Sequence, residues 1–112
     1  MVIVGGTFEV DPDRREEFLR ERHEAIRTSR AEAGCLDYAF SADPVEPGRV
    51  LLFERWTTQE ALDAHLNRLR TQAPASNAVP ALKASVVFYD AEVQPPTQPS
   101  GHGTATVSAN DS

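Results

Sequence analysis

The chain has 112 residues, and its 17 acidic and 11 basic side chains give it a formal net charge of −6. The basic residues are scattered, which argues against a nucleic acid partner, because binding phosphates requires a concentrated positive field. No segment has the length and apolarity of a membrane span, and Met1 leads directly into a strand-like stretch. We therefore expect a cytoplasmic protein that acts without nucleic acid or membrane.

The composition changes near the C-terminal end. From Gln94 onward Pro, Ser, Thr, Gly and Asn dominate, and such a segment buries too little apolar surface to fold. The sequence predicts one domain over residues 1–94 and a disordered tail over residues 95–112.

The first third of the chain predicts a strand followed by a helix. Val2 to Val10 is rich in β-branched residues, and Asp11-Pro12 then combines an N-cap residue with proline at the first helical position. A single charged helix is expected from about Pro12 to Ala33. Gly34 is suited to the residue that ends it.

A hairpin is predicted next. Leu36, Tyr38 and Phe40 alternate with smaller or polar residues, which is typical of a half-buried strand. The segment 43–48 contains two prolines and a glycine and predicts a turn. Val50 to Trp56 forms the returning strand, and its alternate residues Val50, Leu52, Glu54 and Trp56 share one face.

A second helix and a last strand complete the pattern. Thr57 and Glu60 have the spacing of a capping box, with the threonine hydroxyl capping the helix. The apolar stripe of this helix consists of Ala61, Leu62, His65, Leu66 and Leu69. Residues 84–93 alternate as a strand, with Tyr89 and Val86 on opposite faces.

The order is βαββαβ, which predicts a ferredoxin-like α+β fold: an antiparallel four-stranded sheet with two helices on one face. The strands carry apolar residues on both faces, whereas a sheet face in water shows polar ones. We therefore expect a homodimer that buries the open sheet face.

Three segments resemble the antibiotic biosynthesis monooxygenase (ABM) family of dimeric α/β barrels. They are G-C-L-D-Y at residues 34–38, F-E-R-W at 53–56 and Q-E-A-L-D-A-H-L at 59–66. The resemblance implies a cofactor-independent monooxygenase, similar to small quinol monooxygenases, that oxidises a phenolic, quinol or polycyclic aromatic substrate with dioxygen. The chain has no clustered His or Cys spacing and no G-x-G-x-x-G element, so neither a metal nor another cofactor is expected.

That chemistry requires an apolar pocket and a base for a phenolic proton. His65 is the candidate catalytic base, because a titratable ring on an apolar stripe is costly without a partner. Trp56 is a candidate pocket wall, and Tyr38 and Tyr89, expected at inward positions, could bind a substrate oxygen. His23, at the edge of the first helix's stripe, is a further substrate-binding candidate. Each of these residues also has a purely structural interpretation.

Two other functions fit the same residues. One is a non-redox enzyme of the same barrel, such as a cyclase, isomerase or decarboxylase, and the other is a non-catalytic dimer that binds a small ligand. Haem degradation is disfavoured: relatives with that activity have Asn on the first strand and Trp on the second helix, where this chain has Gly5-Gly6-Thr7 and His65.

Overall fold

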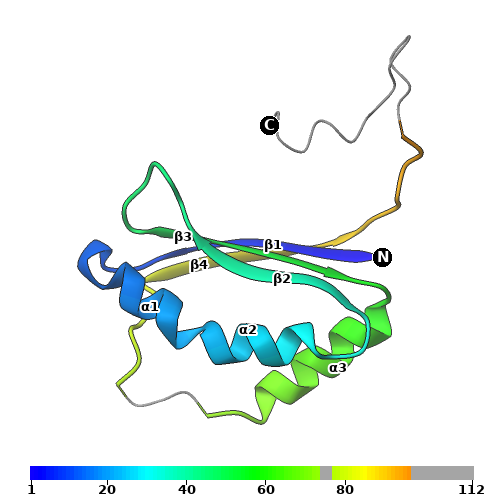
Figure 1. Cartoon of the computed structure of the whole chain (residues 1–112), viewed down its shortest axis with the longest axis horizontal. Helices are drawn as coiled ribbons and strands as arrows, with labels where there is room; N and C mark the ends of the chain where they lie inside the picture. Colours follow the sequence, from blue (N-terminus) through cyan, green and yellow to red (C-terminus); the bar gives the residue numbers. More distant parts are fainter. Residues whose placement is uncertain (74–76, 97–112) are drawn as a thin grey trace.

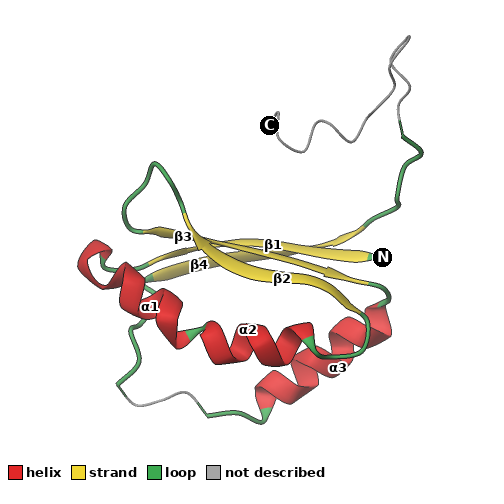
Figure 2. Cartoon of the chain, viewed as in Figure 1, coloured by secondary structure: helices red, strands yellow, loops and turns green. Residues whose placement is uncertain are grey.

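The computed structural model describes residues 1–73 and 77–96. The elements are β1 (Val2–Glu9), the short 3₁₀ helix η1 (Pro12–Arg14), α1 (Arg15–Glu21), α2 (His23–Arg30), β2 (Cys35–Ala42), β3 (Arg49–Trp56), α3 (Gln59–Arg70) and β4 (Lys83–Asp90). The four strands pair antiparallel in the order β2-β3-β1-β4, and Figures 1 and 2 show all three α-helices on one side of the sheet. The predicted ferredoxin-like α+β fold is confirmed.

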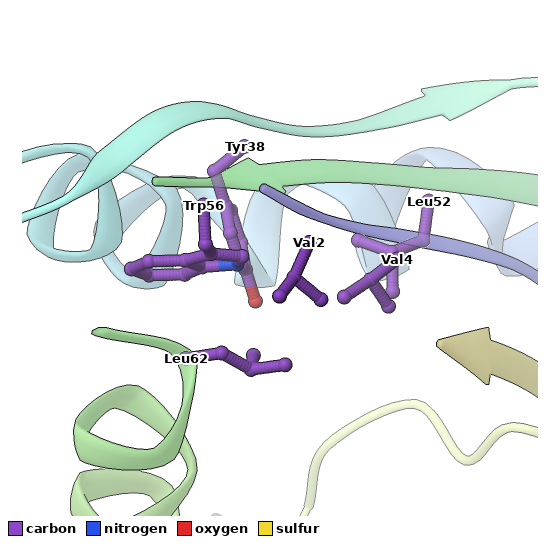
Figure 3. Packing of buried hydrophobic residues seen from close by; sticks show 6 residues of the cluster. All are labelled: Val2, Val4, Tyr38, Leu52, Trp56 and Leu62. Atoms are coloured by element: carbon purple, nitrogen blue, oxygen red, sulfur yellow. The ribbon is translucent and has the colours of Figure 1, made fainter. Parts of the chain in front are cut away.

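The core lies between the sheet and the helices. Alternate residues of β3 are buried, as the period of two predicts: Val50, Leu52, Glu54 and Trp56. One cluster of buried side chains comes from three strands and α3 (Figure 3) and comprises Val2, Val4, Tyr38, Leu52, Trp56 and Leu62. A second cluster around Phe18 lies nearer the hairpin end of the sheet and includes Val10, Val50 and Val79.

The first helix differs from the prediction because it is broken. α1 and α2 meet at Arg22, whose amide donates to the Leu19 carbonyl at 3.0 Å, before the regular pattern resumes with Ile26 donating to the Arg22 carbonyl at 2.8 Å. α2 also ends at Arg30, short of Ala33. The prediction of one helix over residues 12–33 was therefore wrong. No glycine or proline stands at the break, so the sequence carries no local signal for it.

Gly34 does adopt the left-handed conformation expected of it, with φ of 85°. A Cβ atom there would lie 2.5 Å from the Cβ of Ala61 in α3, so the position is also closed by packing. The turn after α2 can therefore lie directly against the start of α3.

The cap of α3 is one residue later than predicted. The Thr58 hydroxyl, not that of Thr57, accepts from the Ala61 amide at 3.1 Å. The Thr57 amide donates instead to the Gly34 carbonyl at 2.8 Å. This bond keeps Thr57 outside the helix, and the capping function moves to the next threonine.

The face of the sheet opposite the helices, here the open face, is apolar. Phe53 is 45% exposed there, and Val87 and Tyr89 of β4 are exposed beside it. Arg55 and Asp37 form an ion pair across β3 and β2 on the same face. β4 ends at Asp90, earlier than the predicted residue 93, and the tail predicted over 95–112 lies outside the described residues from position 97 on.

We propose, from this apolar face, that two chains associate sheet to sheet. Phe53→Glu should convert the homodimer to a monomer, because association would bury two unpaired carboxylates. Light scattering at micromolar concentration measures the change in mass. Val45→Glu, at a 78% exposed position in the hairpin loop, is the control and should stay dimeric. A wild-type protein that is monomeric at this concentration would contradict the proposal.

Candidate functional site

His65 lies on the face of α3 that packs against the sheet and is 1% exposed. Its ring centroid is 4.7 Å from that of Trp56 and 5.3 Å from that of Tyr38, which approaches edge-on. The fold thus brings together three of the residues singled out in the sequence. They come from β2, β3 and α3.

The buried imidazole has a carboxylate partner that the sequence did not reveal. Nδ1 of His65 lies 2.7 Å from Oε1 of Glu32, in the turn between α2 and β2. Arg68 donates to the other oxygen of Glu32 and, at 3.3 Å, to the hydroxyl of the buried Ser29. Glu32 is therefore held between a histidine and an arginine.

Partial burial acts to raise the pKa of the Glu32 carboxyl, but the hydrogen bonds from Arg68 and His65 outweigh it and hold that pKa below its usual value. Glu32 is thus an acceptor at neutral pH, which assigns the proton of a neutral His65 to Nδ1. Nε2 is then left as an acceptor. It is buried, and it has no hydrogen-bond partner among the residues that the structure describes.

Trp56 is held in place by a second carboxylate. Its indole N–H donates to Oε1 of Glu54 at 2.8 Å, and Glu54 is only 5% exposed. Burial raises the pKa of the Glu54 carboxyl, and the Trp56 hydrogen bond opposes this rise. The indole ring cannot turn away from His65 without leaving a buried acceptor unpaired.

A cavity of about 210 Å³ adjoins His65 and Glu54 between the sheet and α3, and Trp56, the predicted pocket wall, is not among the residues that line it. Its polar lining consists of His65, Glu54 and Tyr38, and the remainder is aliphatic or aromatic. The hydroxyl of Tyr38 points from β2 into the space between the sheet and α3 (Figure 3). Burial raises the pKa of Tyr38 to about 12, so the hydroxyl keeps its proton at neutral pH and can donate to a ligand oxygen.

Two other sequence candidates lie elsewhere. Tyr89 pairs with Ile3 and is on the open face, 53% exposed, so its expected inward position was wrong. Phe88, its neighbour in β4, lines the cavity instead. His23 is exposed at the start of α2 and does not line the His65 cavity. The third histidine, His102, lies outside the described residues.

Within residues 1–73 and 77–96, no three His, Cys, Asp or Glu side chains are grouped as a metal site requires. In the same part of the chain, no helix combines the length and apolarity needed to cross a membrane. The expectation that the protein uses no cofactor stays a prediction.

The described residues thus form a βαββαβ sheet whose helices cover a buried histidine beside a small, largely apolar cavity. The family model "Antibiotic biosynthesis monooxygenase" matches residues 1–75, and the chain belongs to this family. The family that the three motifs indicated is therefore confirmed.

Two relatives are similar in sequence over part of their length. The protein sll1783 of Synechocystis, named as uncharacterised, is 41% identical over 64 residues, which are 57% of this chain and 44% of that protein. YcnE of Bacillus subtilis, a monooxygenase by name, is 31% identical over 65 residues, 58% of this chain and 68% of that protein. The matching region thus spans less than half of the Synechocystis protein.

Solved structures show the same fold. An ABM-named protein from Deinococcus radiodurans superposes with a TM-score of 0.68 at 21% identity, over 87% of this chain and 98% of that one. The haem-degrading protein MhuD of Mycobacterium tuberculosis gives 0.67 at 17% identity, over 85% and 99%. At these identities the likeness concerns the fold alone.

Replacing Glu32 with glutamine should destabilise the protein in a pH-dependent way. Because the folded-state pKa of Glu32 is lowered, its stabilising effect is complete above the ordinary value of 4.5 and is lost as the pH falls through the folded-state value. The difference in unfolding free energy between wild type and Glu32→Gln should therefore shrink as the pH falls below about 4.5.

Urea denaturation at several pH values measures this difference. Arg68, His65 and Glu54 are present in both proteins. The matched control is Glu60→Gln, which removes an exposed carboxylate from the first turn of α3. Its unfolding free energy should differ little from that of the wild type at every pH. A Glu32→Gln difference that is constant or grows toward acid would mean that the carboxylate is not ionised in the folded protein.

Proposed function

We propose that this chain is a cofactor-independent monooxygenase that oxidises a phenolic, quinol or polycyclic aromatic substrate with dioxygen, and that His65 is its catalytic base. The observation that carries the proposal is the state of the His65 ring. One nitrogen is fixed on Glu32, and the other is buried without a partner beside an apolar cavity. An unpartnered acceptor in such a place is costly unless a ligand donates to it.

The first step would be proton transfer. A phenolic O–H of the substrate would donate its proton to Nε2 of His65, while the Glu32 carboxylate stabilises the imidazolium through Nδ1–H. Arg68 keeps Glu32 ionised and oriented for this role. The hydroxyl of Tyr38 can donate a hydrogen bond to the developing oxyanion.

Oxidation would then proceed from the deprotonated ring. The electron-rich anion transfers one electron to dioxygen, and the resulting ring radical and superoxide combine into a peroxide anion on a ring carbon that bears hydrogen. The His65 imidazolium then returns its proton to this anion, which gives the hydroperoxide. Loss of water converts that carbon to a carbonyl, so one oxygen atom enters the product and the other leaves as water. Apolar cavity walls favour these steps because they exclude water and protect the intermediates.

The direct test is oxygen uptake. Purified protein incubated with menadiol or a tricyclic anthrone should consume oxygen above the rate of the autoxidation blank. A rate equal to the blank with both compounds would instead favour a non-redox enzyme or a ligand-binding dimer.

His65→Ala should lower kcat/KM by a factor of about 10², the usual contribution of a general base. His65→Gln should restore little, because an amide keeps a polar contact but cannot take up the proton. The matched control is His23→Ala, which removes an exposed imidazole from α2 and should retain the wild-type rate. Both His65 variants keeping more than half of that rate would contradict the role of base.

A further inference from the structure

A second and larger cavity lies next to the one at His65. It has a volume of about 580 Å³ and shares three lining residues with the smaller cavity, namely Tyr38, Phe40 and Leu69. The His65 cavity alone, at about 210 Å³, is smaller than most small-molecule sites, which measure about 300–1,000 Å³. The two cavities therefore adjoin along the side chains of Tyr38, Phe40 and Leu69.

Arg22 lies in the wall of the second cavity, at the break between α1 and α2. Its guanidinium carbon is 3.8 Å from the ring centroid of Phe18 and 5.9 Å from that of Phe40. The side chain is only 26% exposed. A guanidinium is thus held against aromatic rings in the wall of the second cavity, which His65 does not line.

This guanidinium is poorly paired. The nearest carboxylate oxygen is Oε1 of Glu21 at 3.9 Å, and both oxygens of Glu21 already accept from the Val79 amide, at 3.1 and 3.3 Å. Within residues 1–73 and 77–96, Arg22 donates no hydrogen bond from its side chain. Burial accordingly lowers the pKa of Arg22 from its ordinary value.

The chemistry of the Arg22 guanidinium indicates which class of ligand it would bind. A guanidinium carries five N–H donors in a planar fork that matches a carboxylate, and a partly desolvated pair of this kind is stronger than one in water. A neutral carbonyl can accept from the guanidinium, but it supplies neither an opposite charge nor the second oxygen of a carboxylate. An acidic ligand fits better than a neutral one.

We propose that Arg22 binds the carboxylate of a flat polycyclic aromatic acid, whose rings lie along Phe40 and Tyr38 and whose oxidisable ring reaches His65. The spacing suits such a molecule: Phe40 and Tyr38 have ring centroids 5.9 Å apart, and Tyr38 and His65 have theirs 5.3 Å apart. Arg22 would set specificity, and His65 would act on the ring. Only the role of His65 rests on the proposed function, because acid binding requires no turnover.

Binding of a non-reactive acid tests the proposal separately from catalysis. Anthraquinone-2-carboxylate and its neutral primary amide have the same rings, and neither is an electron donor to dioxygen. Isothermal titration of the wild-type protein should give an affinity for the acid about tenfold or more above that for the amide. Equal affinities, or no binding of either compound, would overturn the proposal.

Variants of Arg22 test whether the preference for the acid over the amide depends on this side chain. Arg22→Met keeps an unbranched apolar stem over Phe18 and should weaken acid binding about tenfold or more while changing amide binding less than about twofold. Arg22→Lys should restore part of the preference, since it keeps the charge but not the fork. Arg20→Met removes an equal charge from the exposed side of α1 and is the matched control.

Thermal melts and far-UV circular dichroism establish that each variant is folded. If Arg20→Met and Arg22→Met lose acid affinity equally, the effect is one of net charge and the proposal is wrong. If the protein prefers the acid but consumes oxygen no faster than the blank, the binding proposal is supported and the monooxygenase proposal is wrong.

Discussion

Burying an imidazole requires the protein to supply a partner for it, and much of the arrangement around α3 follows from that requirement. His65 is enclosed by Trp56, Tyr38 and Leu62, and only Nδ1 is paired, through Glu32. Glu32 must in turn stay ionised in a partly buried turn, and Arg68 makes this possible from one helical turn beyond His65. The site is therefore supported by residues that need not touch a ligand.

The same turn depends on close packing of the backbone. Gly34 has no room for a side chain because Ala61 and Thr57 lie against it, and its carbonyl accepts from the Thr57 amide. These contacts hold the segment that carries Glu32 against the start of the helix that carries His65. For the base role proposed for His65 this rigidity would matter, because a catalytic group misplaced by about 1 Å can lose about 10²-fold in rate.

The break between α1 and α2 also determines the position of a side chain, that of Arg22. At Arg22 the chain leaves the α-helical pattern between two helices that both pack on β2. The break leaves a guanidinium over Phe18, in the wall of the larger cavity and only partly in solvent.

The sequence by itself determined the layered fold. Alternation in β3 and the apolar stripe of α3 are local properties, since a period of two or of 3.6 requires one buried face whatever the neighbours are. The same patterns placed Trp56 and His65 on inward faces, and the structure confirms both positions. The motifs at 34–38, 53–56 and 59–66 were sufficient to indicate the family.

Only the tertiary structure decided how the site is completed. Glu32 and His65 are 33 positions apart, and no spacing rule joins a turn to a helix across that separation. The alternation of residues in β4 could not tell which face the helices cover, so Tyr89 was placed inward when it lies on the open face. No glycine or proline marks the break at Arg22 in the sequence. Each of these depends on long-range packing, which local periodicity does not encode.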